Sequence, residues 1–343
     1  AFLNGRIDLS QAEAVMDLID SKNEMARKNS MTQLKGGLSD KIKQLREEII
    51  YQVAFIESAL DDPEHYSLDG FPERLLEQDK KWIHTAKEML DSYDNGRIIA
   101  EGIRTCIVGK PNAGKSSFLN ALLGEERAIV TDIAGTTRDT LEESVTIDGI
   151  TLNIVDTAGI RDTEDKVESI GVERAKKEIE NADLILFLMD TSVQISEEDI
   201  EILQRIRDRK KIILLNKSDK AQTESGFQQS ALQEYISEET PVIAISAKYG
   251  DGIDNFIMEL KNMMFHGKID VNQEVYITNA RHKDALAKTY ESLECVERSI
   301  EAGMPEDFFT IDLMNAYEKL GLIIGESVEE DLVNEIFSKF CTG

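Results

Sequence analysis

The sequence has 343 residues, of which 39 are Lys or Arg and 66 are Asp or Glu, so its formal net charge is −27. This negative field repels nucleic-acid phosphates and argues against tight RNA binding by this chain alone. Only three cysteines occur, which excludes a disulfide framework and a C-x-x-C metal site and indicates a reducing, cytoplasmic setting. The longest apolar runs fall far short of the roughly 20 residues that a membrane helix needs, so we expect a soluble protein. At about 100 to 200 residues per domain, the length suggests two domains.

Helical patterns occupy both ends of the sequence. Apolar residues recur at helical spacings from Leu38 to Leu60, which predicts a long amphipathic helix that ends near Asp61 to Pro63. A second helical pattern runs from about Pro72 to Leu90, and the helical period returns after about Gly267.

Between these ends, short β-rich runs alternate with helical patterns, which predicts a mostly parallel sheet wrapped by helices. The runs cover residues 103–108, 142–147, 152–156, 184–190, 212–216 and 242–245. Neither helical flank is long enough to bury much core alone. We therefore expect an α/β domain, inserted into an all-α domain whose two parts fold together. The expected boundaries are 1–100 and 268–343 for the helical domain and 101–267 for the inserted domain.

A phosphate-binding loop is indicated at Gly109 to Ser116, where G-K-P-N-A-G-K-S fits G-x-x-x-x-G-K-[ST] between a predicted strand and a predicted helix. Glycines allow backbone N–H groups to surround a phosphate, Lys115 can reach the β- and γ-phosphates, and the Ser116 hydroxyl can bind Mg²⁺. The alternative interpretation is a Gly-rich turn without a ligand.

Three further motifs follow in chain order. D-T-A-G at Asp156 to Gly159 ends a predicted strand, where a carboxylate can hold the metal through water and a Gly N–H can contact the γ-phosphate. N-K-S-D at Asn216 to Asp219 places a carboxylate where it can accept from guanine N1–H and the N2 amine, a pair that adenine does not offer. S-A-K at Ser246 to Lys248 follows the last strand, and the Ala247 amide can donate to guanine O6. Together the four motifs predict a Ras-like P-loop GTPase domain.

The residue after D-T-A-G is Ile160, whereas Ras-like enzymes carry there the Gln that orients the attacking water. An aliphatic side chain cannot do this. Another residue must position the nucleophile, and another charge must replace an arginine finger.

The motifs, the flanking helices, the segment T-D-I-A-G-T-T-R-D at residues 131–139 and the C-terminal F-C-T-G resemble the MnmE (TrmE) family over essentially the whole chain. The resemblance implies a GTPase that modifies the wobble uridine of certain tRNAs at carbon 5, adding a carboxymethylaminomethyl or aminomethyl group. The implied partner is the flavoprotein MnmG (GidA), and tRNA is bound through that complex. It also implies a homodimer formed through the G domains when GTP and K⁺ are bound.

The resemblance further assigns residues to the metals and the nucleotide. Asn112, Thr131, Ile133 and Thr136 would surround K⁺, and Thr137 would join Ser116 on Mg²⁺. A monovalent cation beside the transferred phosphoryl group supplies the charge that an arginine finger supplies elsewhere. The full set implied to bind GTP is Asn112, Ala113, Gly114, Lys115, Ser116, Ser117, Thr131, Asp132, Ile133, Ala134, Gly135, Thr136, Thr137, Asp156, Thr157, Ala158, Gly159, Asn216, Lys217, Ser218, Asp219, Ser246, Ala247 and Lys248.

Three more assignments come from the resemblance, each with a plainer alternative. Glu168 would orient the attacking water, although its local pattern also suits a solvated glutamate on a helix. Cys341 would act in the tRNA modification, although it also suits a partly buried tail thiol. Arg6 would contact a folate one-carbon donor, although it also suits a surface charge. The family carries an N-terminal domain that dimerises and helps to bind folate, and Ala1 corresponds to a point inside the full-length family sequence.

Two other functions stay open at this stage. One is a ribosome-assembly GTPase such as Era or Der, although the sequence shows neither the KH module of Era nor the second G domain of Der. The other is a scaffold gated by GTP that hydrolyses it only incidentally, which the isoleucine after D-T-A-G keeps open.

Overall fold

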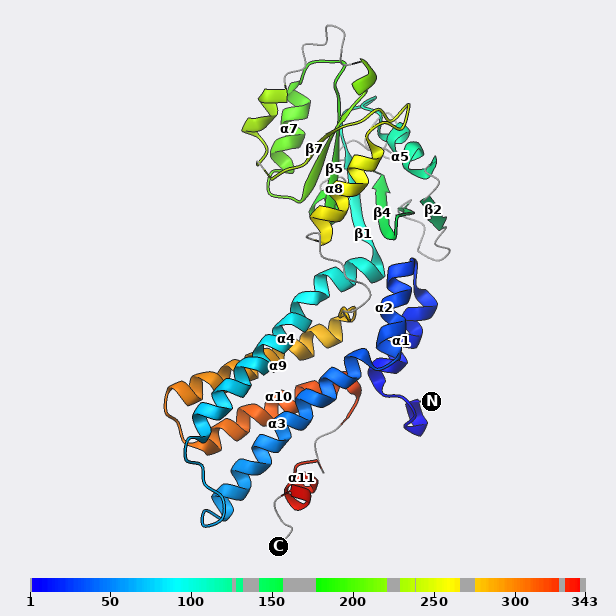
Figure 1. The fold of residues 1–343 in the computed structure, drawn as a ribbon. Helices are drawn as coiled ribbons and strands as arrows, with labels where there is room; N and C mark the ends of the chain where they lie inside the picture. The colour runs from blue at the N-terminus through cyan, green and yellow to red at the C-terminus, as the bar shows by residue number, and fades with distance from the viewer. Residues whose placement is uncertain are drawn as a thin grey trace. The chain divides into compact units, whose positions relative to one another are not determined.

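The computed structural model describes residues 2–124, 128–131, 142–156, 177–220, 229–237, 239–265, 275–326 and 331–339. The chain divides into two compact units, one formed by residues 1–100 with 270–343 and the other by residues 101–269 (Figure 1). The first unit is helical and the second contains a sheet.

The helical unit begins with a short 3₁₀ turn, η1 (Phe2–Asn4). Its α-helices are α1 (Leu9–Asp20), α2 (Glu24–Leu34), α3 (Gly37–Asp61), α4 (Phe71–Glu101), α9 (Ala280–Glu301), α10 (Glu306–Ile324) and α11 (Asp331–Lys339). Polar caps define where its first helices begin. Asp8 and Gln11 form a capping box on α1, and the Asn23 side chain accepts from the Ala26 amide at the start of α2.

Helices α3, α4, α9 and α10 share one hydrophobic core, and α10 packs against both α9 and α3 (Figure 1). The stripe on α3 supplies Ile42, Ile49 and Ile56, each fully buried. Trp82 on α4 is 1% exposed, and its indole N–H donates to Glu48 Oε2 on α3 at 2.7 Å. The core thus combines residues from both ends of the sequence.

The backbone of α4 lies close to the segment that precedes α9. A Cβ on Gly96 would lie 2.0 Å from the carbonyl oxygen of Ile277, so only glycine allows the two backbones to approach this closely. The buried amide of Asn29 on α2 donates to the Tyr276 carbonyl beside this contact, at 3.1 Å. These contacts hold residues 275–279 against α4 and α2, just before α9 begins.

The α/β unit contains a seven-stranded sheet in the order β2-β3-β4-β1-β5-β6-β7. The strands are β1 (Ile103–Val108), β2 (Ala128–Thr131), β3 (Glu142–Ile147), β4 (Ile150–Asp156), β5 (Leu184–Asp190), β6 (Lys211–Asn216) and β7 (Val242–Ala244). The pairs β2–β3 and β3–β4 are antiparallel, and the pairs from β4 through to β7 are parallel. The described helical segments include α5 (Lys115–Gly124), α7 (Glu197–Arg205), η3 (Ser218–Lys220), η4 (Gln229–Glu234) and α8 (Ile253–Phe265).

The expected fold class, a mostly parallel α/β domain within a helical domain, is confirmed. Strand β5 is buried from Leu184 to Met189, as a central parallel strand covered on both faces must be. Within the described residues, no helix is both long enough and apolar enough to cross a membrane.

Candidate functional site

The described residues of the four motifs lie where parallel strands end. In the register of β1 and β4, Ile107 pairs with Asp156, so D-T-A-G begins beside the strand that leads into the phosphate loop. In the register of β5 and β6, Asp190 pairs with Asn216, the first residue of N-K-S-D. Because the carboxyl ends of parallel strands lie at one edge of a sheet, these segments gather at the position where α/β proteins bind nucleotides.

The phosphate loop has backbone angles that its glycines allow. Gly109 has φ +148° and Gly114 has φ +100°. A Cβ on Gly109 would lie 2.4 Å from the Leu188 carbonyl oxygen, and one on Gly114 would lie 2.1 Å from the Asn216 amide nitrogen. Any side chain at either position would displace the loop, so both glycines of the motif have a structural cause.

The ammonium group of Lys115 is held by the loop itself. Lys115 is 9% exposed, and its Nζ donates to the carbonyl oxygens of Gly109 at 2.6 Å and Lys110 at 2.8 Å. It is the first residue of α5, whose N-terminal amides favour an anion. Ser116 and Ser117 follow it and are exposed. A cationic group therefore lies at a helix N-terminus whose next two residues are exposed serines.

Asn216 connects three segments of the site. It is 2% exposed, its amide nitrogen donates to the Ala113 carbonyl at 2.8 Å, and its amide oxygen accepts from the Ala247 N–H at 3.0 Å. The Thr191 hydroxyl and N–H both donate to the Asn216 carbonyl, at 2.9 and 3.0 Å. The sequence indicated the motif containing Asn216 but not that this residue ties the phosphate loop to S-A-K.

The carboxylate proposed to read guanine is oriented by S-A-K. Ser246, fully buried, donates from its hydroxyl to Asp219 Oδ1 at 2.7 Å, while Asp219 itself is exposed. The second carboxylate oxygen and the remaining lone pairs can accept from a ligand. The Ala247 amide, expected to donate to guanine O6, donates here to Asn216, so a base must share it. Lys248 is exposed, and its ammonium donates to the Tyr249 hydroxyl at 3.1 Å.

Two ion pairs beside the site were not predicted from the sequence. Lys110 Nζ lies 2.6 Å from Asp199 Oδ2, and the Lys217 ammonium pairs with Asp190. Lys110 occupies a variable position of the G-x-x-x-x-G-K-[ST] pattern, and both acids lie outside the four motifs. The only local signal is S-x-x-D at Ser196, which forms a capping box on α7.

Several predicted site residues fall outside the described part of the chain: Asp132, Ile133, Ala134, Gly135, Thr136, Thr137, Thr157, Ala158, Gly159, Ile160, Glu168 and Cys341. Thr131 and Asp156 are placed only as the last residues of β2 and β4. Asn112 is exposed in the phosphate loop with φ +63°, and Arg6 is exposed just before α1. The residues described contain no group of three or more His, Cys, Asp or Glu side chains suited to hold a metal ion.

Comparisons with known proteins show which family the chain is similar to. The family model described as the MnmE helical domain matches residues 9–341. The tRNA modification GTPase MnmE of Lachnoclostridium phytofermentans is 55% identical over 100% of this chain and 74% of its own length. The protein of the same name from Clostridioides difficile is 47% identical over the same shares. Among solved structures, Aquifex aeolicus Era bound to GDP and AlF₄⁻ is 29% identical over 55% of this chain and 66% of that one, with a TM-score of only 0.35.

Proposed function

Because the chain belongs to the MnmE family of tRNA modification GTPases, we propose that it hydrolyses GTP at the edge of its sheet to drive a modification of the tRNA wobble uridine at carbon 5. The observation that supports this most directly is the bridge made by Asn216. It joins the phosphate loop to the S-A-K segment, whose Ser246 orients Asp219. One connected set of contacts thus runs from the phosphate loop to the carboxylate that we propose binds guanine.

In this proposal, one part of the site binds the phosphates and the other binds the guanine base. Lys115 exchanges its loop carbonyls for the β- and γ-phosphates, and the amides at the start of α5 bind the phosphate oxygens. Asp219 accepts from guanine N1–H and the N2 amine, which selects GTP over ATP. Guanine O6 shares the Ala247 amide with Asn216 or uses the amide of Lys248.

The site suits Mg²⁺, which prefers oxygen ligands. The exposed Ser116 hydroxyl stands in the first turn of α5, and the strand register puts Asp156 beside β1. Ser116 and Thr137 would hold the ion, with Asp156 acting through water. When bound, the ion neutralises charge that develops on the transferred phosphoryl group.

The site also suits K⁺ at one described residue. Asn112 is exposed in the phosphate loop and has a left-handed backbone conformation, and an amide oxygen is a suitable ligand for a cation beside the phosphates. Thr131, Ile133 and Thr136 complete the proposed ligand set. Glu168 is proposed to orient the attacking water, because Ile160 cannot.

The proposal extends to partners and place. With a net charge of −27, the chain repels tRNA phosphates, so MnmG supplies most of the tRNA affinity in a cytoplasmic complex. Homodimerisation through the G domains, with GTP and K⁺ bound, couples hydrolysis to the modification cycle. A folate donor near Arg6 and a role for Cys341 in the modification are part of the same proposal. The family assignment favours this reading over ribosome assembly or a passive scaffold.

The first test is steady-state GTP hydrolysis in potassium and sodium buffers at matched ionic strength, with light scattering to follow dimerisation. We expect K⁺ to raise the rate at least about tenfold, which corresponds to ~1.4 kcal/mol of the barrier, and to promote association. Asn112→Ala should remove this advantage while GDP binding is kept. Asn120→Ala, which removes another exposed asparagine on α5, is the matched control.

Equal rates in both salts, with no association, would count against the potassium mechanism. A protein that binds GTP tightly but turns over only once would instead support the GTP-gated scaffold.

A further inference from the structure

The segment between β5 and α7 carries an acidic residue at each end. Asp190 is the last residue of β5, and Asp199 lies in the first turn of α7. We call residues 190–199 the β5–α7 connector. None of the four motifs includes it, yet the two aspartates at its ends each pair with a lysine that belongs to one of them.

Asp199 anchors the phosphate loop. It is 2% exposed, and its Oδ2 accepts from Lys110 Nζ at 2.6 Å, from the Ser196 N–H at 2.9 Å and from the Ser196 hydroxyl at 3.0 Å. Lys110 Nζ also donates to the Ser196 hydroxyl at 2.9 Å. Because the pair is shielded from water, removing either partner leaves the other without its ion pair in a buried site, which is strongly unfavourable.

This anchor lies beside the loop carbonyls that hold Lys115, the lysine expected to bind the phosphates. The carbonyl oxygen of Lys110 accepts from Lys115 Nζ at 2.8 Å and from the Ala113 N–H at 3.2 Å. Lys110 thus links two sets of contacts. Its ammonium group pairs with Asp199, and its backbone carbonyl accepts from the Lys115 ammonium within the loop. Releasing the side chain would loosen the groups that cradle a phosphate.

Asp190 anchors the guanine loop in the same way. One of its oxygens accepts from the N–H and hydroxyl of Ser192, and the other accepts from the Lys217 ammonium. Burial alone would raise the pKa of Asp190, but the hydrogen bonds from Lys217 and Ser192 hold that pKa below its usual value, so the carboxylate is charged. Lys217 has φ +65°, a left-handed backbone angle two residues before Asp219.

We propose that Asp190 and Asp199 are positioning residues through which the β5–α7 connector holds the guanine loop and the phosphate loop in register before the nucleotide arrives. The proposal rests on the guanine-nucleotide site described above. Its physical basis is preorganisation, because loops that are already fixed lose less conformational freedom when the ligand binds. Asp190 thereby affects the selectivity for guanine, and Asp199 affects the affinity for the phosphates.

The test compares GDP with IDP, whose hypoxanthine base lacks the N2 amine that Asp219 reads. Dissociation constants are measured by displacement of N-methylanthraniloyl-GDP for the unchanged chain and for Asp199→Asn and Asp190→Asn. Asp199→Asn should weaken GDP and IDP alike, at least about tenfold, and leave their ratio unchanged. Asp190→Asn should reduce the preference for GDP over IDP. Glu198→Gln, an exposed acid on the same turn of α7, is the matched control and should change neither value.

A double-mutant cycle separates positioning from general stability. Lys110→Met and Asp199→Leu should each weaken GDP binding, and the two together should weaken it no more than the worse single change. Lower melting temperatures with unchanged GDP affinity and an unchanged GDP/IDP ratio would overturn the proposal, as would strictly additive losses. If the unchanged chain itself fails to bind GDP, the proposed function fails instead, which the first titration shows directly.

Discussion

At the scale of single residues, Asp79 is the least expected group in the helical unit. It lies on the face of α4 that carries Leu75 and Trp82, and it is fully buried. Neither of its carboxylate oxygens has a hydrogen-bond partner among the described residues. Burial raises the pKa of Asp79 to about 8, and the nearby charge of Glu297 adds to the effect, whereas Lys80 opposes it. The side chain is therefore mostly protonated at neutral pH.

This raised pKa sets the sign of a pH dependence. The folded state keeps a proton that the unfolded state releases, so the contribution of Asp79 to stability falls as the pH rises from about 4 to about 8 and is constant above that. Asp79→Asn should remove this loss. We expect the free energy of unfolding of the variant, relative to the unchanged chain, to increase with pH across that window by up to ~1.4 kcal/mol per unit.

Urea unfolding at several pH values measures this difference, with the exposed Asp91→Asn on the same helix as control. A difference between Asp79→Asn and the unchanged chain that does not vary with pH would show that Asp79 is ionised when folded.

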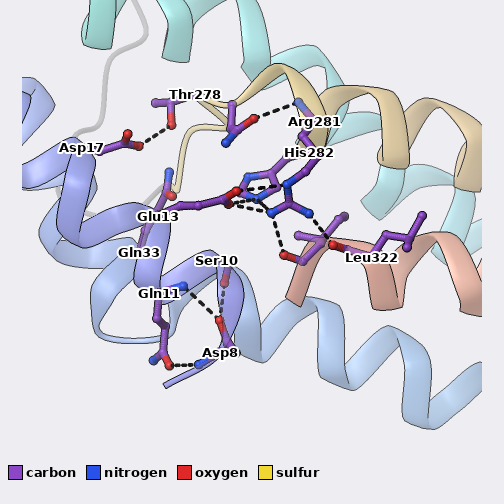
Figure 2. A network of polar contacts seen from close by, with 12 residues as sticks. Asp8, Ser10, Gln11, Glu13, Asp17, Gln33, Thr278, Arg281, His282 and Leu322 are labelled. Carbon is purple, nitrogen blue, oxygen red and sulfur yellow. Dashed lines mark hydrogen bonds and ion pairs between the residues drawn. The ribbon is translucent and has the colours of Figure 1, made fainter. Parts of the chain in front are cut away.

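At the scale of elements, one side chain on α9 connects three helices. Arg281 donates to both carboxylate oxygens of Glu13 on α1, at 3.0 and 2.6 Å, and to the carbonyl oxygens of Leu322 and Ile323 near the end of α10 (Figure 2). His282, 1% exposed, places its Nε2 2.8 Å from Glu13. Glu13 thus links α1 to α9 through the neighbouring side chains of Arg281 and His282.

The contacts of Glu13 give a second pH-dependent prediction, with the opposite sign. Burial would raise the pKa of Glu13, but hydrogen bonds from His282 and Arg281 lower it to about 2. Stability from this carboxylate is present above its unfolded pKa and is lost as the pH falls from about 4.5 towards 2. Glu13→Gln should therefore cost about 2 kcal/mol at pH 7 and little near pH 2.

Thermal unfolding at both pH values checks this, with Glu24→Gln, from the exposed pair of Glu24 and Lys28, as the control. An equal cost at both pH values would mean that shape rather than charge explains the contribution of Glu13.

The elements also show what sequence patterns can and cannot predict. The clean stripe of α3 and the apolar runs of the central strands predicted those elements closely. Helix α10 was not predicted as a separate element because apolar residues lie on both its faces, with Leu313 buried and Ile311 61% exposed. Helix α4 was predicted to end near Leu90 but continues to Glu101, because packing of Gly96 on Ile277 outweighs the low helix propensity of glycine.

The same distinction applies to the candidate site. Its motifs are local in sequence, so their positions at the strand ends could be predicted from the pattern. The pairing of Lys110 with Asp199 joins residues that are far apart in the chain, and nothing local in Lys110 indicates its partner. The bridge made by Asn216 is likewise visible only once the strands are in register.

At the scale of the whole molecule, the helical unit is discontinuous in sequence, since residues 1–100 and 270–343 build it together. Gly96 and Ile277 touch, so the two parts meet where the chain leaves and returns. We expect a chain in which a short Gly-Ser linker joins Ala100 to Val275 to fold into the same helical unit. Residues 1–100 alone should not fold, because α9 and α10 supply much of the core.

Circular dichroism and cooperative thermal unfolding of the two chains test this. A cooperative transition in residues 1–100 alone would show that α3 and α4 form a stable unit without α9 and α10.

The contact between Gly96 and Ile277 also bears on how the protein is made on the ribosome. Helices α3 and α4 emerge before α9 and α10, so their apolar faces lack that cover until α9 and α10 follow the inserted residues 101–269. At roughly 5–20 residues per second, that delay is on the order of ten seconds or more. The inserted unit is contiguous and can fold during this interval. The helical unit is thus begun before the inserted unit and completed after it, and in the meantime the uncovered apolar faces of α3 and α4 are surfaces that a chaperone can protect.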